Sequence, residues 1–387
     1  MRAPIKRIAT GIDVGTHATR VVIIEQTPGE APKIIGTGVA ESRGIRRGYI
    51  VNRADASHTI SLALERAEKM AGVKIKNALL SVGGVSLESL ITHGTATISR
   101  ASGEVGDQDL NKAYQEAEEN VGHLANKRII YRAPVSYKLD NKEVLGSPHN
   151  LIGAKIEVKM LFVTCLEHHL DEIIKTIEDL GVEVDEILPS PMAAAHVALT
   201  KKQRSVGCAL VNIGAETVSI IVFENDLPIS LHIFPIGSTD ITNDIALGLK
   251  IPLEEAEKIK ITGANGLHSK KKLSEIIEAR LYDIFELIES HLKKIKRNGL
   301  LPAGVILTGG GAGIATIEDL AKAALKLPST LVNPQISPAH KNIIKDSSWL
   351  VAYGLLIYAL EKPAEPKDPA FSQIFGTLKT WIKPFLP

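Results

Sequence analysis

Apolar positions near the start of this chain mark a pair of strands joined by a tight turn. The run from Ile8 to Asp13 and the β-branched run from Val21 to Ile24 predict two buried strands. The turn between them contains Gly15 and two threonines, with Asp13 at the end of the first strand. Glycine lets a main chain approach a phosphate closely, and successive turn N–H groups form an anion-binding nest. The pattern therefore predicts a phosphate-binding turn.

The same pattern returns in the second half of the chain, over residues 209–224. There Asn212 and Gly214 take the places of Asp13 and Gly15, and apolar strands flank the turn on both sides. Two strand pairs of one design predict an α/β protein of two related halves that hold a phosphate chain between them.

Apolar residues at helical spacing predict amphipathic helices between the strands. Ser274 is expected to cap the longest helix, which Asn298 and Gly299 end. Thr239 or Thr242 is expected to cap an earlier helix.

Two other stretches of the chain do not follow this alternation of strands and amphipathic helices. From Gly83 to Cys165, strand-like runs surround one helical run, which predicts a small inserted α+β module without chemistry of its own. Residues 303–314 predict a strand and a glycine turn, with a helix from about Ile317.

Composition places the chain among soluble globular proteins, with 387 residues, 44% hydrophobic and 23% charged. A net charge of +1 gives no reason to expect nucleic acid. Cys165 and Cys208 are too few for a disulfide framework or a zinc site. His149, His168 and His169 lack Cys or carboxylate partners at ligand spacing, so we interpret them as ordinary histidines. Without a signal peptide or an apolar run of roughly 20 residues, the sequence predicts a cytoplasmic protein.

Two later features fit the chemistry of the paired turns. One is a helix that carries Glu257 and Lys260, and the other is the run from Gly309 to Gly311. Each feature alone is ordinary, because any α/β fold needs glycine between strand and helix. In this order and spacing they predict hairpins that hold phosphates while the glycine turn and the helix flank a purine and its ribose. A P-loop and a Rossmann fold are excluded, because neither GxxxxGK[ST] nor GxGxxG follows the first strand.

This set of motifs resembles the actin, sugar-kinase and heat-shock-chaperone ATPase superfamily, and nearly the whole chain is similar to the FtsA family of bacterial cell-division proteins. The segments that carry the resemblance are the two phosphate motifs Gly11-Ile12-Asp13-Val14-Gly15-Thr16 and Asn212-Ile213-Gly214-Ala215-Glu216-Thr217, the adenosine motif Leu307-Thr308-Gly309-Gly310-Gly311, the helix Ala256-Glu257-Lys258-Ile259-Lys260, and the insert borders Ser81-Val82-Gly83-Gly84 and residues 152–158. The insert borders are more specific to FtsA than the nucleotide motifs are.

The resemblance implies an actin-like ATPase fold of two related halves around a nucleotide cleft, with an inserted α+β subdomain and a C-terminal amphipathic helix. The implied divisions are 1–83 and 166–205 for the first half, 84–165 for the insert, 206–240 and 300–348 for the second half, 241–299 for a subdomain on that half, 349–360 for the last core helix, 361–370 for a linker and 371–387 for the amphipathic helix.

The resemblance also implies ATP and Mg²⁺ as cofactors, with Asp13 holding the metal through water. The residues implied to contact the nucleotide are Asp13, Gly15, Thr16, His17, Asn212, Gly214, Ala215, Gly237, Glu257, Lys260, Gly309, Gly310 and Gly311.

Three positions depart from the family pattern. Asn212 stands where the second phosphate motif usually has Asp, and an amide cannot act as a base. Ser238 and Thr316 stand where relatives often have glycine. We expect nucleotide binding to be retained and hydrolysis to be slow or absent, so no catalytic residue is assigned.

The last residues carry a second signal. Residues 361–369 form a charged, Pro-spaced linker that cannot pack as helix or strand. Helical spacing then gathers one apolar face and two flanking lysines, which are Phe371, Ile374, Phe375, Leu378, Trp381, Ile382, Lys379 and Lys383. At about 20 Å this helix is too short to span a bilayer and is predicted to lie in the membrane interface, binding weakly and reversibly. The alternative is a helix docked on its own core or a partner, and the linker argues against self-docking.

The resemblance implies a protein that polymerises on the cytoplasmic face of the cell membrane at the division site. It would tether the C-terminal peptide of FtsZ through residues 241–299 and bind other division proteins through the insert. One alternative is the actin-like pilus-assembly protein PilM, which shares the fold and insert but has no comparable tail. Another is a small-molecule kinase, which needs a carboxylate base that Asn212 does not provide. A chaperone is disfavoured, because no substrate-binding domain follows the ATPase motifs.

Overall fold

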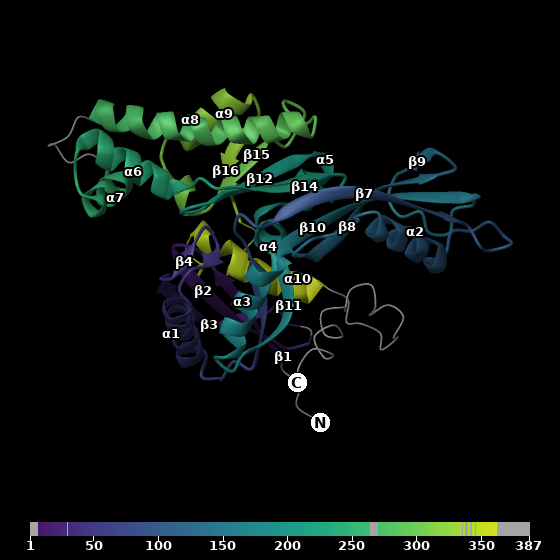
Figure 1. The fold of residues 1–387 in the computed structure, drawn as a ribbon, viewed down its shortest axis with the longest axis horizontal. Helices are drawn as coiled ribbons and strands as arrows, with labels where there is room; N and C mark the ends of the chain where they lie inside the picture. The colour runs from purple at the N-terminus through teal and green to yellow at the C-terminus, as the bar shows by residue number, and fades with distance from the viewer. Residues whose placement is uncertain are drawn as a thin grey trace. The chain divides into compact units, whose positions relative to one another are not determined.

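The computed structural model describes residues 7–28, 30–263, 270–334, 336, 340, 343–344 and 346–361, and Figure 1 labels their helices and strands. The chain folds as two compact units, each described here by itself. Unit 1 comprises Met1–Gly83, Asp171–Ala198 and Pro334–Pro387, and unit 2 comprises Gly84–Leu170 and Leu199–Asn333. Within the described ranges, no helix is both long enough and apolar enough to cross a bilayer.

Unit 1 is built on a five-stranded sheet of order β11-β6-β1-β2-β3. The first three strands form an antiparallel meander, and β6 and β11 continue the sheet in parallel. The strands of unit 1 are β1 (Arg7–Val14), β2 (Ala18–Gln26), β3 (Lys33–Glu41), β6 (Asn77–Val82), β11 (Glu183–Pro189) and the short pair β4 (Ile45–Arg46) and β5 (Tyr49–Ile50).

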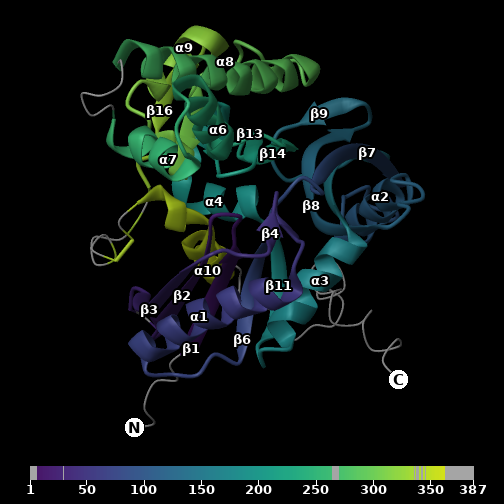
Figure 2. The ribbon, with the colours of Figure 1, turned by 60° about the vertical axis from the view of Figure 1, so that its left-hand side comes forward.

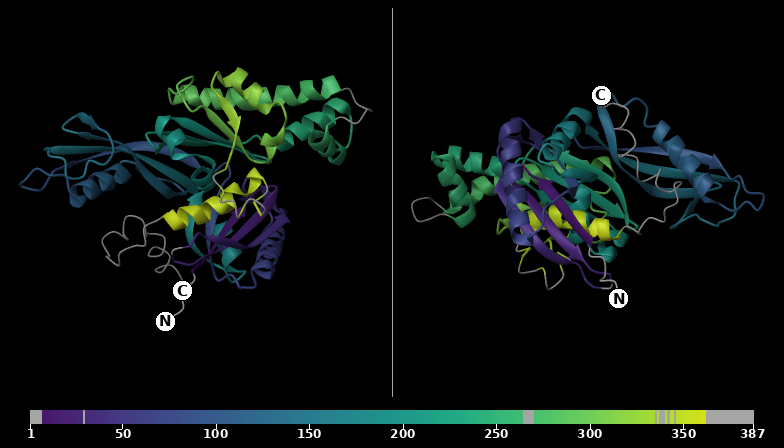
Figure 3. Two further views of the ribbon diagram at one scale, coloured as in Figure 1. Left: turned by 180° about the vertical axis from the view of Figure 1, so that it is seen from behind. Right: turned by 90° about the horizontal axis from the view of Figure 1, so that it is seen from below.

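Helices cover both faces of this sheet. Helix α1 (Arg53–Ala71) begins after Asn52, whose side chain accepts from the amide of Asp55, and ends at Gly72. It lies along β2 and β3 (Figure 2). Helix α10 (Leu350–Glu361) packs on β1 and on α4 (Ser190–Ala198), and Figure 3 shows it in yellow against the purple strands. The remaining helices of this part are α3 (Glu167–Glu178) and the 3-10 turn η2 (Ser347–Trp349).

Unit 2 contains a second five-stranded sheet with the same arrangement, in the order β14-β13-β12-β15-β16. Again three antiparallel strands are followed by two parallel ones. These strands are β12 (Cys208–Ile213), β13 (Val218–Glu224), β14 (Leu227–Phe234), β15 (Val305–Thr308) and β16 (Ser329–Leu331). The predicted duplication of one α/β half is therefore confirmed.

One long helix dominates the cover of the second sheet. Helix α8 (Lys270–Lys294) packs on α6 and α9 and buries Ile284, Ile288 and Leu292 in a core shared with the strands (Figure 1). The other helices are α5 (Lys201–Val206), α6 (Ser238–Leu249), α7 (Leu253–Thr262), the 3-10 turn η1 (Gly310–Gly313) and α9 (Ile317–Leu325).

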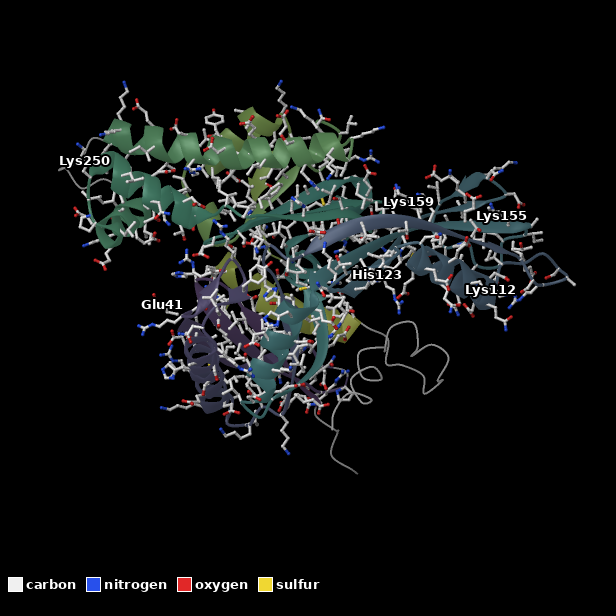
Figure 4. The ribbon with its side chains drawn as sticks, viewed as in Figure 1. Glu41, Lys112, His123, Lys155, Lys159 and Lys250 are labelled. Atoms are coloured by element: carbon white, nitrogen blue, oxygen red, sulfur yellow. The ribbon has the colours of Figure 1, made fainter. Side chains whose placement is uncertain are left out.

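The remainder of unit 2 is the predicted α+β insert, a sheet of order β7-β10-β8-β9 with one helix. Alternate residues of β10 such as Ile156 and Val158 are buried in a core shared with α2, while Lys155 and Lys159 point away from it (Figure 4). The elements are β7 (Glu88–Thr97), α2 (Asp107–Glu119), β8 (Lys127–Leu139), β9 (Lys142–Val144) and β10 (Lys155–Leu166).

Three predicted helix ends are wrong. Helix α8 begins at Lys270, not at Ser274, because Leu273 adds a buried position to an earlier turn. It ends at Lys294, before Asn298, because Lys296 adopts a left-handed backbone conformation with φ 58°. Helix α6 is capped by neither predicted threonine but begins after Gly237, whose amide donates to the side chain of its third residue.

Two stacked histidines predict how stability depends on pH. The rings of His232 in β14 and His291 in α8 lie 5.0 Å apart. Burial lowers the pKa of His291 to about 4, and burial and Lys294 lower the pKa of His232. An unfolded histidine titrates near about 6.5, so the unfolded chain binds more protons between these values. The free energy of unfolding should therefore fall as the pH drops from about 6.5 to about 4.

This pH dependence can be tested with His291→Gln, whose amide can still meet the Ser230 hydroxyl that lies 2.9 Å from the imidazole. We expect the urea midpoint of the variant to fall less than that of the unchanged chain between about pH 7 and about pH 4.5. Equal falls in the two midpoints would contradict the prediction.

Candidate functional site

The first predicted phosphate turn joins β1 to β2 in unit 1. The amide of Gly15 donates to the carbonyl of Ala18 at 3.2 Å, which closes the turn. Ser42, which follows β3, braces the turn with two hydrogen bonds. Its hydroxyl donates to the carbonyl of Gly15 at 2.7 Å, and its backbone amide donates to the carbonyl of His17 at 2.9 Å. Within the described part of the chain, the amides of Thr16 and His17 have no acceptor. The turn thus presents two N–H groups on a braced backbone.

Asp13 is the last but one residue of β1, beside this turn, and is only 9% exposed. The Ser81 hydroxyl, at the paired position of the parallel strand β6, donates to its Oδ1 at 2.6 Å. Burial raises the pKa of Asp13, and the Ser81 bond and the Arg20 charge lower it by less. The guanidinium of Arg20, opposite Asp13 on β2, lies 5.8 Å from the ring centre of Trp349. The carboxylate is therefore buried, oriented and close to a cation.

The second turn, in unit 2, repeats this geometry. The amide of Gly214 donates to the carbonyl of Thr217 at 2.9 Å, as Gly15 does to Ala18. The amide of Ser238, which follows β14, donates to the carbonyl of Gly214 at 2.9 Å. The Ala215 amide has no acceptor among the residues described. Both predicted turns therefore have one architecture.

Gly237 lies directly against this second turn. A Cβ atom at Gly237 would stand 2.3 Å from the carbonyl oxygen of Ala215, so no larger residue fits. The Gly237 amide donates to a carboxylate oxygen of Asp240 at 2.8 Å, and the Thr239 amide donates to the Ala215 carbonyl. The start of α6 is therefore fastened to the turn.

The three consecutive glycines after β15 are not equivalent. Gly309 has φ 92°, and a Cβ there would lie 2.2 Å from Asn212 Oδ1 and 2.5 Å from the carbonyl oxygen of Ile213. A Cβ at Gly311 would lie 2.5 Å from the Ile213 side chain, whereas one at Gly310 would meet no described residue within 4 Å. Gly309 and Gly311 are thus required for packing, whereas among the described residues nothing obstructs a Cβ at Gly310.

Glu257 and Lys260 of α7 form an ion pair of 2.7 Å. Lys260 also donates to the Thr242 hydroxyl at 2.9 Å and to the carbonyl of Ser238 at 3.1 Å. The amide of Ser238 is hydrogen-bonded to the carbonyl of Gly214. Hydrogen bonds within unit 2 therefore link the predicted adenosine helix to the second turn.

These groups match the chemistry of a phosphate chain and Mg²⁺. Two buried polar atoms beside the turns, Arg20 Nε and Thr308 Oγ1, have no hydrogen-bond partner among the described residues. No three His, Cys, Asp or Glu side chains in the described ranges converge on a metal position. Mg²⁺ typically takes one or two carboxylates together with phosphate oxygens and water, and Asp13 can supply one.

Sequence reasoning missed Ser81, Arg20, Thr308 and Thr242 as members of the two sites. Ser81 and Thr308 lie within motifs that were recognised, but their positions beside Asp13 and Asn212 depend on parallel pairing between distant strands. The predicted membrane-contacting residues, from Phe371 to Lys383, lie outside the described residues.

The duplicated sheets, the paired glycine turns and the insert define an actin-like ATPase fold. A solved structure of the PilM–PilN type IV pilus biogenesis complex is similar with a TM-score of 0.68 and 17% identity, covering 92% of this chain and 99% of that one. The structure of MreB5 of Spiroplasma citri bound to ADP is similar with a TM-score of 0.51 and 13% identity, covering 96% and 99%.

The chain belongs to the FtsA family of cell-division proteins. The family model described as cell division protein FtsA matches residues 209–354, and that of the SHS2 domain inserted in FtsA matches residues 84–164. Cell division protein FtsA of Pseudomonas aeruginosa is 28% identical over 97% of this chain and 98% of its own length. That of Bacillus subtilis is 28% identical over 90% of this chain and 82% of its own length.

Proposed function

We propose that this protein binds ATP with Mg²⁺, assembles into actin-like filaments on the cytoplasmic face of the cell membrane, and tethers FtsZ there during division. Family membership supports the role in division. The nucleotide part is carried by one observation, the repeated turn whose amides at Thr16, His17 and Ala215 have no acceptor in the described chain. Solved structures of the same fold include one bound to ADP.

Several of the predicted residues have a defined role toward the nucleotide in this proposal. Asp13 orients Mg²⁺ through water, and the amides around Gly15 and Gly214 hold phosphate oxygens. Glu257 and Lys260 approach the ribose and base, and the open side of Gly310 admits adenosine. Because Asn212 cannot accept a proton as a base, the bound nucleotide is hydrolysed slowly and controls assembly.

The family and the tail sequence support the remaining partners in this proposal. The amphipathic segment 371–387 provides the membrane contact, residues 241–299 bind the C-terminal peptide of FtsZ, and the insert binds other division proteins. A single short helix binds a bilayer weakly, so polymerisation, which presents many tails at once, strengthens attachment. The protein is then peripheral and concentrated at the division site.

Electron microscopy on anionic lipid monolayers tests the proposal. With ATP and Mg²⁺ we expect the full chain to form filaments on the lipid, and a chain lacking residues 371–387 to form none there. A variant with Trp381→Glu and Phe375→Glu keeps the length of the tail and should behave like the deletion, because its apolar face is lost. Filaments on lipid without the tail would contradict the proposed attachment.

A second candidate, a pilus-assembly function like that of PilM, is favoured by the TM-score of 0.68 to the PilM–PilN complex. The two candidates differ in their need for the tail. Cosedimentation with anionic vesicles separates them, because the division function requires binding that disappears when residues 371–387 are removed. Absence of vesicle binding by the full chain would favour the pilus function.

A further inference from the structure

Corresponding strands of the two sheets carry a corresponding pair of polar residues. In unit 1, Asp13 of β1 pairs with Ser81 of the parallel strand β6. In unit 2, Asn212 of β12 pairs with Thr308 of the parallel strand β15. Each pair stands at the end of the central parallel strands, immediately before a phosphate turn or a glycine run. The two hydroxyls therefore occupy equivalent positions in a duplicated structure.

The two hydroxyls differ in their hydrogen bonding. Ser81 donates to Asp13 at 2.6 Å and is satisfied. Thr308 is 1% exposed, and its Oγ1 has no partner among the residues described. A buried hydroxyl without a partner destabilises the folded state, so such atoms are uncommon. The orphaned hydroxyl needs an acceptor that the described protein does not supply.

The side chain at position 212 explains why Thr308 lacks this acceptor. Asp13 presents a carboxylate to its hydroxyl partner, whereas Asn212 is an amide with a single acceptor oxygen. That oxygen lies against Gly309, where a Cβ would come within 2.2 Å of it. In the neighbouring turn, the Ala215 amide also has no acceptor in the part of the chain that the structure describes, so unit 2 places a hydroxyl and an N–H without partners near one glycine run.

We propose that Thr308 is a phosphate-binding residue of unit 2. Its hydroxyl donates to an oxygen of the nucleotide's phosphate chain, directly or through one ordered water. This inference rests on the proposed function, because it requires that the chain binds ATP. It adds a donor that none of the recognised motifs assigns to the ligand.

The role predicts opposite effects on nucleotide-free stability and on ATP affinity. Thr308→Val keeps the shape and removes the hydroxyl, so the melting temperature without nucleotide should stay the same or rise. The dissociation constant for ATP with Mg²⁺, measured by calorimetry on the full chain, should increase about tenfold to about a hundredfold, as for the loss of a bond to a charged acceptor. Thr308→Ser, which keeps the donor, should bind ATP as the unchanged chain does.

Ser81→Ala is the matched comparison for stability. Its hydroxyl has a protein partner, so its removal should lower the nucleotide-free melting temperature, unlike Thr308→Val. Binding of ATP by Thr308→Val within twofold of the unchanged chain would overturn the inference alone, and so would a nucleotide-free destabilisation equal to that of Ser81→Ala. Failure of the unchanged chain to bind ATP would overturn the proposed function, and the inference with it.

Discussion

Replacing Asp13 with alanine is expected to abolish the thermal stabilisation that ATP and Mg²⁺ give to this protein. Asp13 is buried, bonded to the Ser81 hydroxyl and close to Arg20, so its carboxylate is held in one orientation at the first turn. A ligand at about a hundred times its dissociation constant stabilises a protein by about 2.7 kcal/mol, a rise of roughly 5–10 °C in melting temperature for a domain of this size. In the Asp13→Ala variant we expect this rise to vanish.

A matched control separates a lost metal contact from a general loss of charge in unit 1. Asp185 of β11 is an exposed carboxylate whose bond to Asn77, at 2.9 Å, lies on the surface. Asp185→Ala should keep the full shift with ATP and Mg²⁺. Differential scanning fluorimetry of both variants, with and without nucleotide, makes the comparison. An unchanged shift in Asp13→Ala would refute the assignment of this residue to the nucleotide site.

The hairpins were predictable from sequence because their information is local. Apolar strands on each side of a glycine turn need no knowledge of the rest of the fold, and both Gly15 and Gly214 close the expected turns. The repeat itself predicted two related halves, which the two strand orders confirm. Local pattern was less reliable at helix ends, where a buried Leu273 extended α8 past the expected cap at Ser274.

The polar partners of the turns were not predictable, because they depend on pairing between segments far apart in the chain. Ser81 meets Asp13 only when β6 joins β1 in parallel, and Thr308 meets Asn212 only when β15 joins β12. Neither strand pairing can be deduced from the periodicity of hydrophobic residues in the sequence. The ion pair of Glu257 and Lys260, in contrast, follows from their spacing of three residues on one helix. The hydrogen bond from Lys260 to the Ser238 carbonyl could not be predicted in this way, because it depends on the packing of α7 on α6.

The second large expected effect concerns the glycine run after β15. Alanine substitutions at the neighbouring residues Gly309 and Gly310 should change the stability of the protein by different amounts. Gly309→Ala should destabilise unit 2 strongly, because φ 92° with ψ 169° is a backbone region that essentially only glycine adopts, at a cost of about 1–3 kcal/mol. The new Cβ would also collide with Asn212 and with the backbone at Ile213. The Cβ of Gly310→Ala meets no described residue within 4 Å, so the urea midpoint of this variant should be unchanged or slightly higher.

Substitutions at Gly309 and Gly310 also distinguish the packing role of the glycine run from its proposed contact with adenosine. Gly310→Val should fold with near-normal stability, since a Cβ at this position meets no described residue within 4 Å, yet it should weaken ATP binding if the ligand uses that side of the turn. Loss of the ATP-induced thermal shift in Gly310→Val, with its nucleotide-free midpoint preserved, is the expected result. A preserved shift would mean that the glycines serve packing alone, because Gly309 and Gly311 are already explained by their contacts with Asn212 and Ile213.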